Sequence, residues 1–124
     1  TKKSSRLLLQ CQVSWNIWCT IAGDLGVQIC THNNFRQFYE EWMSKRVPNP
    51  ARKRLYTVAF FAISWSLWTK QNKMIFELQE IDLPTLIHTI KWRIAFWSKV
   101  WKEPIPYSTE ELVRNFSAIP ILFP

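Results

Sequence analysis

Glycine is scarce in this chain, with only 2 glycines among 124 residues. No Asn-Gly or Asp-Gly pair is present either. Two-residue β-hairpins depend on such pairs because their turns need backbone conformations with positive φ. The lack of glycine therefore argues against a hairpin-rich β protein and favours an all-α fold.

Carboxylates are also few, and they are poorly placed for catalysis. The only two aspartates, Asp24 and Asp82, lie in separate segments. Polymerase and ribonuclease H chemistry needs clustered carboxylates that hold two metal ions. The adjacent glutamates at 40–41 and 110–111 point apart on a helix. No G-x-S-x-G or phosphate-binding Gly-rich motif occurs. We therefore expect no catalytic residue, no cofactor and no enzyme.

The cysteines and the apolar runs indicate in which cellular compartment the chain is expected. Cys11, Cys19 and Cys30 form no C-x-x-C motif and no even set. They indicate a reducing, intracellular compartment, and we expect them to pack as small apolar side chains. The longest apolar run, Leu55 to Trp68, is shorter than the roughly 20 residues that cross a membrane. Membrane insertion is not expected. The chain begins with Thr1 and has no signal-peptide pattern, so we interpret it as a fragment or a trimmed chain.

What the sequence does contain is helical spacing of large apolar side chains. Asn33 or Asn34 can cap a helix whose apolar residues recur at i, i+3, i+4, i+7 and i+8. We expect four main helices, with one short helix at the C-terminal end. The expected ranges are from Ser4 or Ser5 to about 22, 35–46, 51–78 and 83–101, followed by 109–116.

The helix expected over 51–78 is long, and its middle is apolar nearly all round. Such a helix is predicted to be the central, buried member of a compact bundle. Trp65 and Trp68 are therefore expected in the core, where Trp65→Ala would cost about 3–5 kcal/mol. Residues 1–103 are expected to form one helical domain. Residues 104–124 would add a capping helix and an apolar tail packed on it.

Capping signals support these boundaries. Pro50 sits where a first-turn proline opens a helix, and Asp82 precedes Pro84 as an N-cap. Ser108 and Glu111 have the spacing of a capping box.

The chain is strongly basic, with 16 Lys+Arg against 9 Asp+Glu and a net charge of +7. A basic chain favours acidic partners, so RNA or DNA phosphates are the expected ligand. Two tryptophans beside the cations could stack on bases. A surface that simply faces water remains open for the cluster at 52–54. The candidate nucleic-acid-binding residues are Arg52, Lys53, Arg54, Lys91, Arg93, Lys99, Lys102, Trp92 and Trp101.

Three stretches carry a family resemblance: "LLLQC…SWNIW", "AISWSLWTKQNKMIF" and "IKWRIAFW". Their order resembles the carboxy-terminal region of plant LINE-type (non-LTR) retrotransposon reverse transcriptases, around and after the reverse-transcriptase zinc-binding domain. Gln71 departs from the family pattern, which usually has Arg there. The resemblance spans roughly 7–102 and implies a nuclear or cytoplasmic protein. The matching positions are Trp65, Trp68, Lys70, Asn72 and Phe76.

The family's zinc site is incomplete here. By resemblance, Cys11 occupies the last ligand position, but Arg6 stands where the family has His. The first two cysteine positions would lie before Thr1. Because a structural zinc site uses four protein ligands, we expect no metal in this zinc-binding-domain remnant.

Two functions follow from these observations. The first is a non-catalytic, helical nucleic-acid-binding accessory region of a retroelement reverse transcriptase or its remnant. The alternative is a domesticated protein–protein interaction module that does not bind nucleic acid. The apolar tail "IPILFP" favours the alternative, because large aliphatic side chains seldom remain in water.

Overall fold

The computed structural model describes residues 12–32, 34–77, 83–99 and 105–124, with side chains given for all of these except 12–13 and 70–77. These residues form an all-α fold, which confirms the predicted fold class. The helices are α2 (Gln12–Asp24), α3 (Phe35–Ser44), α4 (Pro50–Glu77), α5 (Leu83–Ser98) and α6 (Thr109–Arg114), followed by the 3₁₀-helix η2 (Phe116–Ala118) and α7 (Ile119–Leu122).

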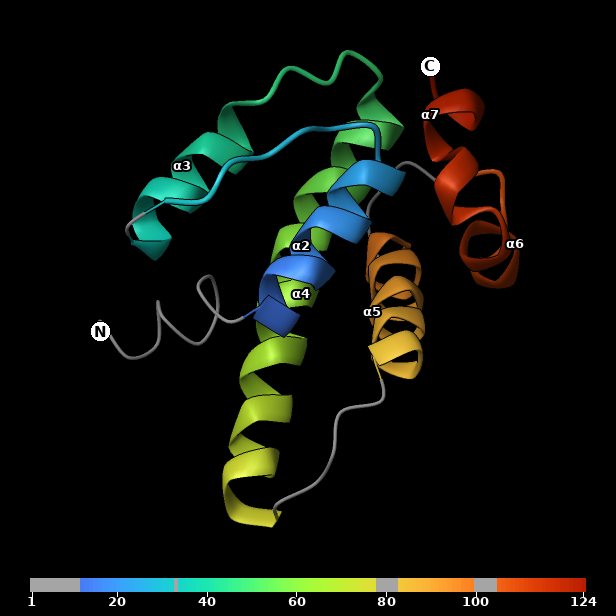
Figure 1. Cartoon of the computed structure of the whole chain (residues 1–124). Helices are drawn as coiled ribbons and strands as arrows, with labels where there is room; N and C mark the ends of the chain where they lie inside the picture. The colour runs from blue at the N-terminus through green and yellow to red at the C-terminus, as the bar shows by residue number, and fades with distance from the viewer. Residues whose placement is uncertain (1–11, 33, 78–82, 100–104) are drawn as a thin grey trace.

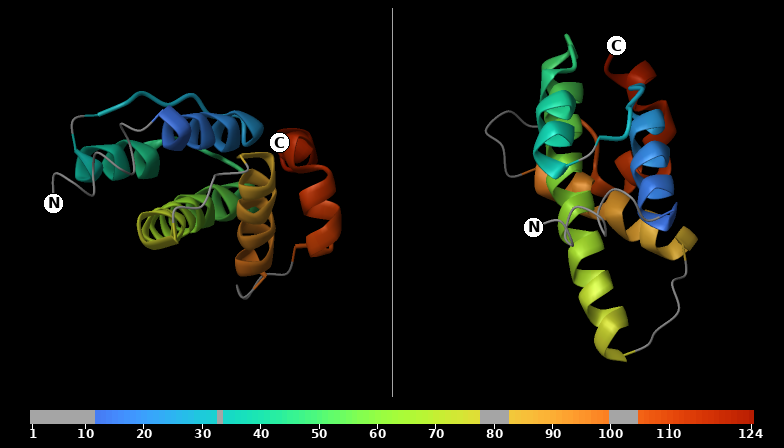
Figure 2. Two further views of the ribbon diagram at one scale, coloured as in Figure 1. Left: turned by 60° about the horizontal axis from the view of Figure 1, so that its bottom comes forward. Right: turned by 60° about the vertical axis from the view of Figure 1, so that its left-hand side comes forward.

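The long helix α4 is the centre of the bundle (Figures 1 and 2). Helix α5 crosses α4 at a steep angle (Figure 2) and makes the most extensive contact with it, while α2 packs against both. Helix α3 lies along the first part of α4, α6 covers the outer side of α5, and η2 packs against α2 and leads into α7. The last turns of α4 extend beyond α2 and α3, so its two halves have different surroundings.

The predicted N-terminal ends of the helices are confirmed where the structure describes them. The Asn34 side chain accepts the Gln37 N–H at 2.9 Å and caps α3. Pro50 is the first residue of α4, as predicted. Ser108 and Glu111 form the predicted capping box at the start of α6. The predicted cap at Asp82 lies outside the described residues.

An aromatic cluster fills the space between α2, α3 and the first half of α4. The Trp42 ring stacks on Tyr56 with centroids 4.4 Å apart, and its Nε1–H donates to the Tyr56 carbonyl at 3.0 Å. Trp18 meets Phe38 edge-on at 4.8 Å. These four side chains are fully buried. Such ring pairs add to the free energy of burial, so this cluster is the main stabilising contact between the three helices.

The C-terminal segment folds back onto the bundle. Leu112, Phe116, Ile119 and Phe123 are buried in the same core as the main helices. The predicted apolar tail is thus largely helical, forming η2 and α7. Helical packing buries Ile119 and Phe123 and partly buries Leu122, but it leaves Ile121 80% exposed.

The prediction that Trp65 and Trp68 pack in the core is wrong. Their exposed fractions are 55% and 42%, and neighbouring Phe61 is 50% exposed. Phe60, Ile63 and Leu67, on the other side of α4, are buried as expected. The helix is apolar nearly all round, but among the described residues its neighbours cover only part of its circumference.

The expectation that the cysteines pack as small apolar side chains is wrong for two of them. Cys19 and Cys30 are free and exposed. Cys19 faces outward because Trp18 and Ile21, on the other side of α2, occupy the core. Cys11 lies outside the described residues.

Candidate functional site

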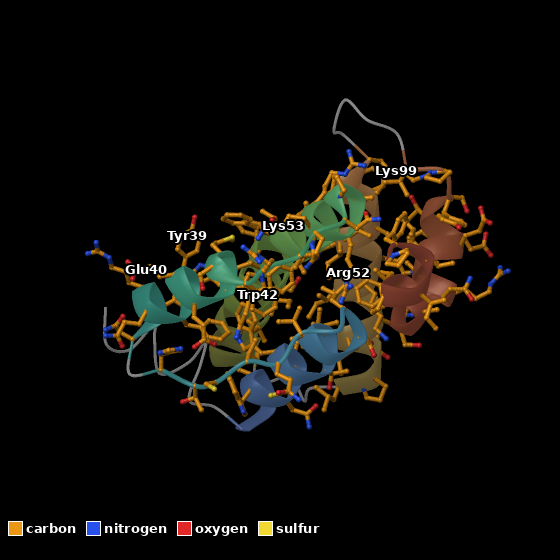
Figure 3. The ribbon with its side chains drawn as sticks, turned by 90° about the horizontal axis from the view of Figure 1, so that it is seen from above. Tyr39, Glu40, Trp42, Arg52, Lys53 and Lys99 are labelled. Carbon is orange, nitrogen blue, oxygen red and sulfur yellow. The ribbon has the colours of Figure 1, made fainter. Side chains whose placement is uncertain are left out.

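Arg52, a predicted phosphate ligand, is bonded inside the protein. Its Nε and Nη2 donate to the Leu25 carbonyl at 3.2 and 3.0 Å, where the chain leaves α2. Nη2 also reaches the Gly26 carbonyl at 3.5 Å. A cation is favourable at a helix C-terminus because the last carbonyls carry partial negative charge. Arg52 therefore joins α2 to α4 (Figure 3).

Lys53 makes the matching contact with α3. Its Nζ donates to the Lys45 carbonyl at 3.1 Å and to the Met43 carbonyl at 3.4 Å. Arg54, the third member of the predicted cluster, has an exposed fraction of only 6%. A cation in the first turn of a helix interacts unfavourably with the dipole of that helix. Arg52 and Lys53 offset this cost because they bond to carbonyls at the C-terminal ends of α2 and α3.

Lys91 and Arg93, two predicted cations on α5, contact different neighbouring elements. Lys91 Nζ lies 3.1 Å from Asp24 Oδ2 and 5.4 Å from the centre of the Phe116 ring. Arg93 Nη1 donates to Ser66 Oγ at 2.6 Å, toward α4. Both cations are partly buried between helices. They are therefore poorly placed to neutralise phosphates together.

Lys99 and Trp92 are the exposed members of the predicted set. Trp92 is 38% exposed, and its Nε1–H donates to His88 Nε2 at 3.0 Å. Figure 3 shows Lys99 at the end of α5, away from Arg52 and Lys53. Lys102 and Trp101 lie outside the described residues. The structure therefore does not bring the described candidates onto one face.

The structure instead presents an exposed aromatic ridge on α4, formed by Phe61, Trp65 and Trp68 at i, i+4 and i+7. This ridge forms one wall of an open groove of about 430 Å³, the aromatic groove. Phe35 at the start of α3 and Trp97 on α5 belong to the same groove. The lining residues are Phe35, Phe61, Ser64, Trp65, Trp68 and Trp97.

The groove is apolar. Its lining contains five aromatic side chains and one serine, and no charged residue. Ser64 Oγ is buried and has no hydrogen-bond partner within the part of the chain that the structure describes. Arg93, one turn before Trp97 on α5, is bonded to Ser66, and Lys99 comes after the last residue of α5. Such a site can hold an apolar group but offers little for catalysis.

Sequence reasoning missed this site although the spacing was available. Phe61, Trp65 and Trp68 fall on one side of a helix, and Ile63 and Leu67 on another. The sequence prediction placed the whole middle of this helix in the core because it is apolar on nearly every side. Distinguishing the two required knowing which sides α2, α3 and α5 occupy.

A polar cluster anchors the loop between α2 and α3. Glu41 accepts the Cys30 N–H at 3.2 Å, and its other oxygen pairs with His32 Nε2 at 2.5 Å. Burial opposes ionisation of Glu41, but the hydrogen bonds from His32 and Cys30, and the charges of His32 and Lys45, lower its pKa overall. This cluster orders the loop.

Two other kinds of site were sought in the described ranges. There, no group of three or more His, Cys, Asp or Glu side chains could hold a metal ion. No helix in those ranges is long and apolar enough to cross a membrane. Comparison of the chain with protein-family models, with curated proteins and with solved structures found no significant match.

Proposed function

We propose that this chain is a non-catalytic protein-interaction module that binds an apolar segment of a partner protein in the aromatic groove. The observation that carries the proposal is the joint exposure of Phe61, Trp65 and Trp68 beside a groove. Contiguous exposed apolar surface commonly marks an interaction site, and tryptophan is enriched among the residues that dominate binding energy.

The positions of the cations support this choice over phosphate binding. Arg52, Lys53 and Lys91 hold helices together, so contact with phosphates would compete with bonds that stabilise the fold. The aromatic ridge has no comparable role, since each of its side chains is at least two-fifths exposed. Phe96 and Ile121 are exposed as well, at 63% and 80%, but only the ridge residues line a groove together with other rings among the described residues.

A displayed peptide library tests this function. The parent protein should select peptides whose binding is lost with Trp65→Ala and kept with Trp92→Ala. Trp92 is the matched control because it is an exposed tryptophan outside the groove lining. If the parent selects no peptide, or only peptides that the Trp65→Ala protein binds equally well, the proposal fails.

Nucleic-acid binding, as in an accessory region of a retroelement reverse transcriptase or its remnant, is the second candidate. The net charge of +7 and the exposure of Arg46 and Lys99 favour it. Gel shifts with RNA and DNA across salt concentrations test it. Affinity should fall steeply with salt, and Lys99→Glu should reduce the salt slope by about one unit. Binding that is insensitive to salt would exclude this function.

A further inference from the structure

We propose that the apolar segment bound in the aromatic groove is the aromatic ridge of a second copy of this chain, so that two copies form a two-fold symmetric dimer. This inference rests on the proposed function and names the partner. It follows from the shape of the face, the exposed area of its rings and the uncharged character of the described lining residues.

The face has both parts that a two-fold contact needs. In such a contact the same patch of each copy meets the other, so a protruding part requires a hollow on the same patch. Phe61, Trp65 and Trp68 form the exposed ridge, and the groove lies directly beside them. The ridge of one copy can therefore enter the groove of the other, and the reverse contact forms at the same time.

The exposed rings supply most of the area that a dimer needs. The three ridge side chains have exposed fractions of 42% to 55%, and Tyr39 is 40% exposed. Tyr39 extends the ridge, because its ring centroid lies 6.5 Å from that of Phe61. At about 200 Å² for a whole aromatic side chain, these four rings expose about 400 Å². A specific interface buries about 500 Å² or more on each partner, and the partly exposed rings of Phe35 and Trp97 add to the same face.

The chemistry of the lining favours a second copy over a transient partner. Interfaces between copies of one chain are more apolar than transient interfaces, with aromatic residues enriched and charged residues depleted at their cores. The described lining consists of five aromatic residues and one serine, and none of these residues carries a charge. Two-fold symmetry brings a group close to its own counterpart, so a cation in the lining would repel its copy. The groove brings no such pair together.

The net charge of +7 opposes association, but its effect at this face is small. Arg36 pairs with Glu40 at 3.2 Å, and Arg93 donates to Ser66 at 2.6 Å. Lys99 comes after the last residue of α5. Repulsion between exposed charges more than about 8 Å apart is largely screened at physiological salt. An apolar contact does not depend on ion pairs, so added salt should strengthen the dimer rather than weaken it.

Analytical ultracentrifugation of the parent protein over a wide range of concentrations tests the dimer. The mass should rise from 14.9 kDa toward twice that value as the concentration increases, and added salt should not reduce it. Peptides selected by the groove should dissociate the dimer, because they compete for the same site.

Charge substitutions at Trp65 test whether this face makes the contact. Because the ridge is itself a wall of the groove, the side chains at position 65 of the two copies lie close together in such a dimer. Trp65→Glu and Trp65→Lys each place like charges there, so each should weaken the dimer by about tenfold or more. Mixing the two variants brings opposite charges together and should restore association by about tenfold or more. Trp92→Glu and Trp92→Lys are the matched controls and should dimerise as the parent does.

Each other outcome overturns a stated part. A protein that stays monomeric at every concentration, but binds peptides that Trp65→Ala does not bind, would overturn the second copy and leave the interaction module intact. A dimer that both charged variants retain would use another face and would also overturn the inference. Binding of an oligo-dT or oligo-U strand that is lost with Trp65→Ala would overturn a protein occupant. Circular dichroism controls for folding, and Trp68→Glu with Trp68→Lys gives a second pair if the first is unfolded.

Discussion

The aromatic residues of α4 have different surroundings along the helix. In the first half, Tyr56 and Phe60 are buried against α2 and α3, and Arg52 and Lys53 bond to the ends of those helices. In the second half, Trp65 and Trp68 are about half exposed. The difference shows that an aromatic residue in an apolar helix is buried only where a neighbouring helix covers it.

Helix α3 sets the boundary between these halves. Its rings contact α4 as far as Tyr39, whose centroid lies 6.5 Å from Phe61. Figure 3 shows Trp42 pointing into the bundle and Glu40 at its edge, and the Tyr39 ring meets Phe60 edge-on at 5.2 Å. The first half thus serves stability, and the second half has surface available for binding.

Replacing a ring in the covered half should have the largest effect. Trp42→Ala removes a fully buried ring, its stacking on Tyr56 and a buried hydrogen bond. We expect a loss of about 3–5 kcal/mol in the free energy of unfolding, measured with urea. Trp65→Ala is the matched change in the open half and should cost about 1 kcal/mol or less. Equal losses would remove the distinction between the two halves.

The contact between α2 and α4 depends on a glycine. Gly26 has φ +79°, and a Cβ there would lie 2.3 Å from Arg52 Nη2 and 3.0 Å from Pro120 Cγ. Gly26→Ala should therefore lower the free energy of unfolding by about 2 kcal/mol, through left-handed backbone strain and the displaced guanidinium. Gly23→Ala, within α2 and with nothing within 4 Å, should instead stabilise by about 0.5–1 kcal/mol. A stabilised Gly26→Ala protein would contradict the close contact.

Loss of the Arg52 guanidinium should lower the free energy of unfolding somewhat less than Gly26→Ala does. Arg52→Gln removes charged hydrogen bonds to the Leu25 carbonyl, and we expect a loss of about 1.5 kcal/mol in urea unfolding. Arg36→Gln is the control, because its side chain is 88% exposed and pairs only with Glu40 among the residues described. That change should cost a few tenths of a kcal/mol. If both changes cost the same, Arg52 does not join the helices as described.

The smallest expected effect is a pH dependence at the loop that reaches α3. The pKa of Glu41 lies below its usual value of 4.5, so ionised Glu41 stabilises the folded state. This contribution is present above the unfolded pKa and is lost as pH falls through the lower folded pKa. The free-energy difference between the parent and Glu41→Gln should thus shrink below about pH 4.5. A difference that stays constant from pH 7 to pH 3 would contradict the lowered pKa.

Most of the helix boundaries could be predicted from residues that lie next to one another. Asn34, Pro50 and the pair Ser108 and Glu111 act on the backbone of their own helix, so their effect is visible in the sequence. The helices over 116–122 were not predicted, since the last predicted helix ended near 116 and the residues after it were described only as an apolar tail. A proline in the first turn of a short helix is compatible with helix formation.

The environment of the candidate site residues could not be predicted in the same way. The cations at 52, 53 and 91 looked available because their partners, the carbonyls at Leu25 and Lys45 and the carboxylate of Asp24, are distant in sequence. Charge and spacing show which side chains can bind phosphate. They do not show which of them the fold already uses.

Periodicity, capping residues and the lack of glycine were sufficient to specify an all-α chain with a long apolar helix, because these act through hydrogen bonds and steric contacts within a few residues. Which face of that helix meets water depended on where α2, α3 and α5 pack around it. Tertiary packing buried Trp42 and left Trp65 at the surface, although both lie in helices rich in apolar residues. The physical reason is that burial depends on contacts between residues distant in sequence, and helices around α4 can cover only part of its circumference.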